Sequence, residues 1–378
     1  MQILWNELKK ILTWKMLLLI VAVNAVMYFL FIEFYITHFP NGRPELDYYN
    51  VSVEVLDRYG IDIDEAAYEG MKKTYASGIK KVDAFLQATP KYAEKGLTTY
   101  EKVMNIEDDG PLDLRWELYD ETIGDTLWEL QAWKSFIEVY ESGEEILDGW
   151  IDYEMSNAQE NRINELKETK QWMVFPDVAL ENYKMLIKEI AVTVFLSIVI
   201  LISPIFIKDR LGRIDALQYT AKTGRNLFKV KIIAGFLATF LVVSGLLTIY
   251  FSLYATNHTA MFFDLPIHKL VGHLSWYDPT FFQFILLTVF GIYLLAFISA
   301  AIAMTTSSIV PNMISLIGVQ IPYVFLLNGV IVNYLVTRVI SIYVAKWLVP
   351  TAYGMLLVAS VVFIVLMWKR EKTRDLLL

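Results

Sequence analysis

Three of the four histidines fall in one short stretch, His258, His268 and His273, together with Asp264 and Asp278. Imidazole and carboxylate groups both ligate zinc, so this stretch is the first place to look for a metal site. The spacing of these residues matches no zinc-binding pattern, and histidines at a membrane interface account for the same sequence. We therefore predict no metal site in this chain.

The sequence carries none of the common catalytic or nucleotide-binding motifs. It has no Gly-x-x-x-x-Gly-Lys-Ser/Thr loop for ATP phosphates, no His-Glu-x-x-His helix, no Gly-x-Ser-x-Gly elbow and no dinucleotide glycine fingerprint. It contains no cysteine, which excludes a thiol nucleophile and a disulfide. We expect that the chain is not an enzyme and holds no cofactor of its own.

Polar amides, rather than charged groups, stand inside the apolar segments. Asn24, Gln320 and Asn328 are the candidates for lining a translocation pathway. The ordinary use of such amides is hydrogen bonding between helices, at about 1 kcal/mol each. The lack of charge near the centre of any apolar segment argues against a proton-coupled transporter and favours an external energy source.

The elements that position these residues are long apolar helices. Residues 279–337 include no charged residue, and a water-soluble domain of this size could not hide such a run. Four further apolar runs bring the predicted number of spanning helices to six. Their predicted bounds are 14–34, 189–207, 232–254, 281–304, 309–332 and 347–368. The strands of a β-barrel alternate apolar and polar residues, which these runs do not.

Charge predicts the orientation of these helices. The segments 1–15, 208–231 and 369–378 together hold 14 Lys and Arg residues, whereas 264–280 and 333–346 hold three. The positive-inside rule makes the first group cytoplasmic, so both termini are expected inside. We expect a multi-pass protein of the plasma membrane. The lack of cysteine in so large an exported region favours a bacterial one.

Residues 35–188 are predicted to form a large extracellular domain between the first two spans. The segment holds 32 acidic and 16 basic residues, so it is strongly acidic. Apolar residues recur in it at steps of three and four, which indicates mostly helical structure. The helices are predicted over 64–87, 123–140 and 144–171. The shorter segments are predicted as an amphipathic interfacial helix at 1–13, extracellular loops at 255–280 and 333–346, and a cytoplasmic tail at 369–378.

The segment 208–231 is the most informative cytoplasmic connection. Leu211, Ile214 and Leu217 recur at helical spacing before a break at Gly224, which predicts a short amphipathic helix at the membrane face. Such a helix either holds the loop to anionic lipid or docks a soluble partner. The candidate docking residues are Asp209, Arg210, Leu211, Gly212, Arg213, Ile214, Leu217, Gly224 and Arg225.

This layout resembles the permease subunits of the ABC-2-type transporter family, the transmembrane subunits of bacterial ABC exporters. In that family the second span leads through an acidic residue, a glycine, a leucine, a Ser/Gly-Arg pair and a lysine into the third span. The corresponding residues here are Asp209, Gly212, Leu217, Gly224, Arg225 and Lys231. The amphipathic start of the chain, from Trp5 to Lys10, also resembles the interfacial helix at the N-terminus of those subunits.

The resemblance implies an all-α integral membrane protein whose loop helix docks on a separately encoded ATPase, which would hold the ATP and Mg. Two permease chains, identical or different, would form the pathway. By analogy the cargo is a peptide or a lipid-like or antimicrobial compound. Membrane lipid is the other expected partner, and no nucleic acid is expected. The alternatives are a membrane sensor or scaffold whose extracellular domain binds a ligand, and a membrane-embedded enzyme, for which the sequence offers no catalytic set.

Overall fold

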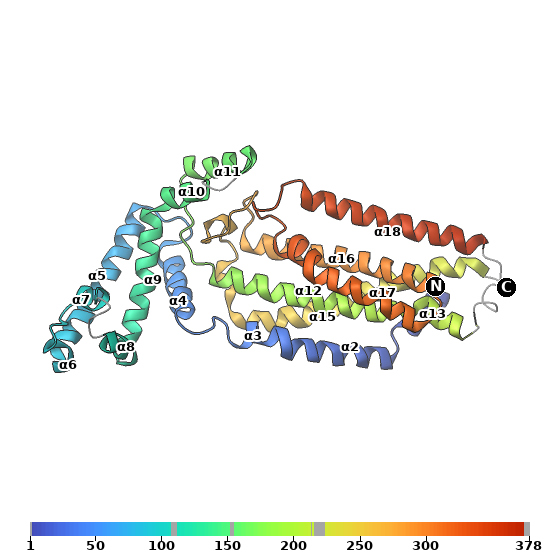
Figure 1. Ribbon diagram of the computed structural model, residues 1–378, viewed down its shortest axis with the longest axis horizontal. Helices are drawn as coiled ribbons and strands as arrows, with labels where there is room; N and C mark the ends of the chain where they lie inside the picture. The colour runs from blue at the N-terminus through green and yellow to red at the C-terminus, as the bar shows by residue number, and fades with distance from the viewer. Residues whose placement is uncertain (1, 107–111, 152–154, 213, 215–223, 374–378) are drawn as a thin grey trace. The chain divides into compact units, whose positions relative to one another are not determined.

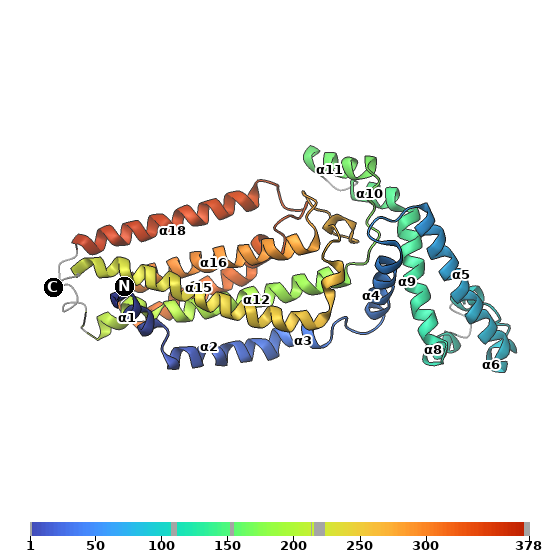
Figure 2. The ribbon, with the colours of Figure 1, turned by 180° about the vertical axis from the view of Figure 1, so that it is seen from behind.

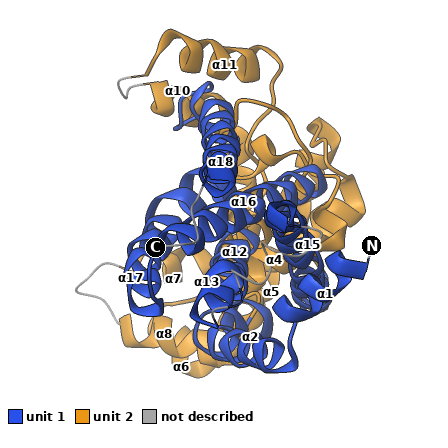
Figure 3. Cartoon of the chain, turned by 90° about the vertical axis from the view of Figure 1, so that its right-hand side faces the viewer, with its two compact units in different colours: residues 1–38, 182–258, 282–378 blue, residues 39–181, 259–281 orange. Residues whose placement is uncertain are grey.

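The computed structural model describes residues 2–106, 112–151, 155–212, 214 and 224–373. All regular elements in these ranges are helices, apart from two isolated β-bridges. The helical fold class predicted from the sequence is therefore confirmed. The chain divides into two compact units, coloured separately in Figure 3. Unit 1 comprises 1–38, 182–258 and 282–378, and unit 2 comprises 39–181 and 259–281.

Unit 1 contains the long apolar helices, apart from residues 178–181 of α12 and Phe281 of α16, which belong to unit 2. Its elements are α1 (Gln2–Ile11), α2 (Trp14–Met27), a π-helical turn (Tyr28–Ile32), α3 (Glu33–Thr37), α12 (Val178–Ile202), α13 (Pro204–Leu211), α15 (Leu227–Tyr254), α16 (Phe281–Ile309), α17 (Met313–Leu326), a π-helical stretch (Leu327–Thr337) and α18 (Leu348–Thr373). The described residues include six helical stretches that are long and apolar enough to span a membrane. This number of candidate spanning helices is the one predicted from the sequence.

The six stretches differ in how far the chain itself covers them. The stretch that contains α12 is the most enclosed, whereas those beginning at Trp14, Met313 and Leu348 leave most of their surface uncovered. In both ribbon views α12 runs beside α15 and α16, while α2 and α18 lie on the outside of this unit (Figures 1 and 2). Helices that are apolar all round suit a lipid environment, because their outer faces need no water.

Polar side chains mark where two of the apolar helices begin. Thr13 accepts the backbone N–H of Met16 at the start of α2, at 3.4 Å. Asn312 accepts the N–H of Ser315 at the start of α17, at 2.9 Å. Such caps satisfy backbone donors that have no partner within the helix.

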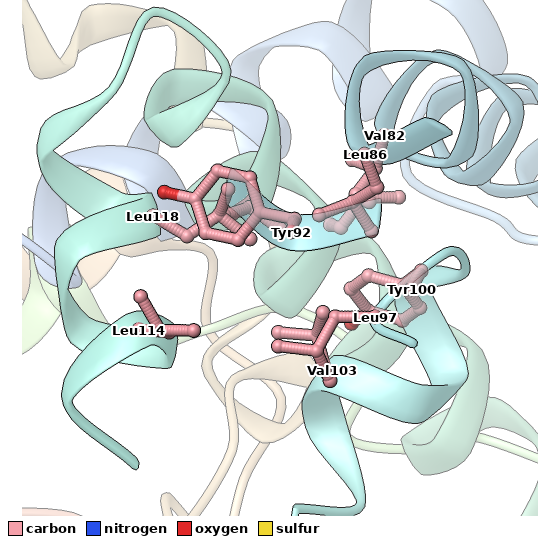
Figure 4. Packing of buried hydrophobic residues seen from close by; sticks show 10 residues of the cluster. Val82, Leu86, Tyr92, Leu97, Tyr100, Val103, Leu114 and Leu118 are labelled. Atoms are coloured by element: carbon pink, nitrogen blue, oxygen red, sulfur yellow. The ribbon is translucent and has the colours of Figure 1, made fainter. Parts of the chain in front are cut away.

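Unit 2 is a separate helical unit. Its helices are α4 (Glu45–Tyr59), α5 (Glu65–Ala88), α6 (Pro90–Ala93), α7 (Tyr100–Met104), α8 (Leu112–Asp120), α9 (Gly124–Glu141), α10 (Gly143–Ile151) and α11 (Asn157–Glu168). The long helices α5 and α9 pack along each other. A cluster of buried residues that includes Leu86, Tyr92 and Leu118 forms a core between α5 and the short helices that follow it (Figure 4).

Two of the three helices predicted in this unit are confirmed. The helix predicted over 64–87 is α5, which Asp64 caps by accepting the N–H of Ala67 at 2.8 Å. The helix predicted over 123–140 is α9. The single helix predicted over 144–171 is wrong, because two helices, α10 and α11, occupy that segment. Ser156 and Gln159 form a capping box that starts α11 anew.

Candidate functional site

A proline separates α13, the helix that contains Lys208, from α12. Because Pro204 has no N–H, α13 begins there as a separate helix. Ser307 of α16 supports its first turn, since its Oγ accepts the backbone N–H groups of Phe206 and Ile207 at 3.2 Å each. The guanidinium of Arg210 donates to the carbonyl of the same Ser307 at 2.6 Å. Both ends of α13 are thus fixed to one residue of α16.

A buried ion pair joins α13 to α15. The Nζ of Lys231 lies 2.5 Å from Oδ2 of Asp209, and the two side chains are only 6% and 10% exposed. Lys10 of α1 lies 4.0 Å from the same carboxylate and 2.6 Å from Glu7. Burying charge is costly unless the partners are close and hydrogen-bonded, as they are here. This charge cluster, Glu7, Lys10, Asp209 and Lys231, connects three helices.

Stacked aromatic rings connect α13 and α15 to α18, the last helix of unit 1. The ring of Phe228 stacks on Phe206 at 5.0 Å and on Trp368 at 5.8 Å between centroids. Lys229 and Lys372 place their ammonium groups 4.7 Å and 5.1 Å from the Trp368 ring. Cations over an aromatic face attract it, so α18 is tied to α15 and, through Phe206, to α13.

The space beside the charge cluster is small. A cavity of about 70 Å³ lies there, with a lining that includes Glu7, Lys10, Met16, Leu201, Pro204 and Lys208. A volume of this size holds a few water molecules and no cargo. The charge cluster and the aromatic rings therefore form a joint, meaning a set of contacts between helices, and not a substrate pocket.

The predicted docking residues divide into inward and outward groups. Asp209 is buried in the ion pair, and Arg210 is committed to Ser307. Leu211 and Ile214, in contrast, are 59% and 44% exposed. Asp209 therefore joins α13 to α15, and the accessible apolar side chains are Leu211, at the end of α13, and Ile214, three residues further on.

The remaining docking candidates lie on either side of the loop. Gly212 follows the last residue of α13. Gly224 and Arg225 form a short 3₁₀ turn before α15, and Gly224 has a φ of 51°, a conformation that favours glycine. Arg213 and Leu217 lie outside the described residues.

Two of the three candidate pathway amides join helices. The Nδ2 of Asn24 donates to Oγ of Ser197 at 2.8 Å, and the hydroxyl of Tyr250 donates to Oδ1 of Asn24 at 2.9 Å. This connects α2, α12 and α15. Gln320 of α17 donates to Oγ of Ser203, at the break between α12 and α13. Both amides make the interhelical hydrogen bonds that are their ordinary use.

Asn328 stands apart from this pattern. It is exposed within the π-helical stretch Leu327–Thr337, and its backbone carbonyl accepts from Nδ2 of Asn333 at 3.5 Å. The same Nδ2 donates to the carbonyl of Gly329 at 2.9 Å. The side-chain amide of Asn333 thus donates to two backbone carbonyls of the π-helical stretch that follows Pro322.

The histidines in 255–280 do not gather at one point. His268 is buried in unit 2 with Nδ1 2.7 Å from Oδ1 of Asp278, although neither ring nitrogen makes an aligned hydrogen bond among the described residues. Arg162 also pairs with Asp278 and donates to the carbonyl of Ser275 at 3.1 Å. Burial lowers the pKa of His268, and the nearby Asp278 opposes that effect. His273 lies in a different cluster, described below.

No local pattern in the sequence indicates the contacts of Lys10 and Ser307 with α13, because those partners are about one hundred or more residues away along the chain. No family model matches this chain, and no curated protein or solved structure was found to match it. The charge cluster and Ser307 connect α1, α13, α15 and α16 on either side of the 208–231 loop.

Proposed function

We propose that this chain is the transmembrane, or permease, subunit of an ABC-2-type exporter. It would couple ATP hydrolysis by a separate ATPase to movement of a substrate across the plasma membrane. The observation that supports this most is the buried pair of Asp209 and Lys231. These residues are the first and last positions of the pattern that carries the family resemblance. A loop closed at its base by buried charge moves together with the helices on both sides.

The exposed end of α13 supports the docking role. Leu211 and Ile214 offer apolar surface to a soluble partner, next to the basic side chain of Lys208. Apolar residues at the centre of a contact with a polar rim are typical of protein interfaces. Force applied to α13 by the ATPase would reach α16 through Ser307 and α15 through Lys231.

The rest of the chain suits a pathway formed with a second permease chain. The stretches beginning at Trp14, Met313 and Leu348 are barely covered by the chain itself, so their apolar faces are available to lipid and to a second subunit. We propose that segment 35–188 is extracellular. Its 32 acidic and 16 basic residues would attract a cationic cargo such as an antimicrobial peptide.

A second candidate function is a membrane sensor or scaffold. A cavity of about 680 Å³ in unit 2 favours it, because that volume is within the range of ligand pockets. Tyr75, Asp83, Tyr100, Arg115 and Lys134 contribute to its lining. Nε of Arg115 is buried and makes no hydrogen bond in the described part of the chain, so an anionic ligand could use it. This alternative requires no ATPase.

The two functions are distinguished by purifying the full chain from its native membrane in mild detergent. We expect an ATPase with a Walker motif to accompany it in stoichiometric amount, and Leu211→Asp to remove that ATPase. Met261→Asp is the matched control, because Met261 is an exposed apolar residue of unit 2 and does not belong to the 208–231 loop. Full retention of the ATPase by Leu211→Asp would contradict the docking role, and its absence from the wild-type preparation would favour the sensor.

A further inference from the structure

Two distant segments of unit 2 are held together by backbone hydrogen bonds. The N–H of Phe175 donates to the carbonyl of Lys269 at 3.0 Å, and the N–H of Val271 donates to the carbonyl of Phe175 at 2.8 Å. This is the parallel bridge between Phe175 and Leu270. The side chains that follow each segment are therefore brought to a fixed place.

A tight turn then directs His273 back toward the other segment. The N–H of His273 donates to the carbonyl of Leu270 at 3.1 Å, and Gly272 has a φ of 79°. A positive φ at the third residue of such a turn favours glycine. On the other segment Asp177 precedes the first residue of α12, and its carbonyl accepts the N–H of Glu181 at 2.8 Å.

The three side chains meet with ligand atoms facing one another. Nε2 of His273 lies 3.0 Å from Oδ2 of Asp177 and 3.7 Å from Oε2 of Glu181. One ligand atom from each residue lies within 4.8 Å of the other two. Bonds of 2.0–2.2 Å to a tetrahedral zinc ion place its ligand atoms about 3.3–3.6 Å apart. Small side-chain rotations would bring all three groups to that spacing.

We propose that Asp177, Glu181 and His273 bind one divalent transition-metal ion, and that zinc is the ion they fit best. One imidazole nitrogen and two carboxylate oxygens form a nitrogen-and-oxygen ligand set that zinc accepts. Calcium and magnesium prefer oxygen ligands alone, which disfavours them here. The two carboxylates balance the charge of the ion, and their partial exposure leaves an approach from water.

The bound ion would tie the turn at Leu270–His273 to the first turn of α12. Without metal, Nε2 of His273 is within hydrogen-bond distance of Oδ2 of Asp177, so the ion and that hydrogen bond would compete for the same atoms. The proposal revises the sequence-based expectation of no metal site, which placed His273 with other histidines. It does not depend on the transport function.

The test uses the full chain in detergent, purified through a tag that contains no histidine and stripped with a chelator. Zn²⁺ is titrated in competition with a chromophoric chelator, and Co²⁺ is added separately to record its visible spectrum. The variants are His273→Gln and Asp177→Asn. Asparagine is as good a helix-capping residue as aspartate, so the second variant removes a ligand without disturbing the start of α12. His258→Gln is the control, because His258 is an exposed histidine outside the cluster.

We expect one zinc ion per wild-type chain and a tetrahedral Co²⁺ spectrum. Loss of a direct ligand should weaken binding by at least the 10- to 100-fold that loss of a supporting contact typically costs. His258→Gln should bind as the wild type does. Equal melting temperatures of all proteins in chelator would show that the variants fold. The proposal is overturned if the wild type binds no zinc, or if both cluster variants bind it as tightly as the control.

Discussion

Replacing Asp209 by Asn tests whether the buried charge cluster holds unit 1 together. Asparagine preserves the shape of the side chain but removes its charge, which leaves Lys231 as a cation that is only 6% exposed. The remaining neighbour Lys10 is itself positive and lies on the Asp209 side of the pair. The variant therefore takes away the carboxylate that pairs with this buried cation.

The magnitude follows from the burial of both partners. Breaking a buried ion pair by removing one member costs about 3–5 kcal/mol, because the other charge stays desolvated. Lys134→Met is the comparison for an exposed pair, since Lys134 and its partner Glu138 are 54% and 60% exposed and such a pair is worth about 1 kcal/mol or less. The double variant Asp209→Leu, Lys231→Leu removes both charges and should recover most of the loss.

The assay is unfolding of the detergent-solubilised chain by increasing amounts of sodium dodecyl sulfate, followed by tryptophan fluorescence. The expected order of stability is wild type, Lys134→Met, the double variant and then Asp209→Asn. Equal losses in Asp209→Asn and Lys134→Met would refute the reasoning. So would a double variant no more stable than Asp209→Asn, because the loss of the Asp209 partner of the Lys231 charge would then not be the cause.

Three further substitutions test other joints. Asn24→Leu removes the hydrogen bonds with Ser197 and Tyr250 and should cost about 1 kcal/mol in the same unfolding assay, whereas Val26→Leu on the exposed side of α2 should cost nothing measurable. Arg162→Met should destabilise unit 2 by about 2 kcal/mol, seen as faster proteolysis within 157–168, because it deprives Asp278 and the Ser275 carbonyl of their donor. His268→Gln should flatten the dependence of stability on pH below about 6.5. Burial lowers the pKa of His268 in the folded state, so the unfolded state binds more protons and the stabilisation present above that pH is lost as pH falls. An unchanged pH profile would contradict this.

The spanning helices were predictable because a bilayer imposes a constraint that is visible in the sequence. Charge-free runs such as 279–337 have no other use in a chain of this size. The amphipathic helices α5 and α9 were predictable from periodicity for a similar reason. The missed break before α11 had a signal, since Ser156 and Gln159 stand at the spacing of a capping box.

Only some residues of the joint at α13 could be predicted from the sequence. The pattern in 208–231 selected Asp209 and Lys231, but their contact depends on how α13 and α15 pack. Lys10 and Ser307 reach the same place from distant parts of the chain, and no local pattern indicates that. His273 was noticed as a possible ligand, yet its partners come from the start of α12. Docking through Arg213 and Leu217 remains a prediction.

The central claim is that the loop after α13 docks on an ATPase. The most direct test replaces Leu211 by a photo-crosslinking amino acid, in cells that make the chain in its native membrane. The account predicts a crosslink from position 211 to a protein with a Walker motif, and none from the control position Met261. Crosslinks from position 211 to lipid alone, with the protein folded and inserted, would contradict the account.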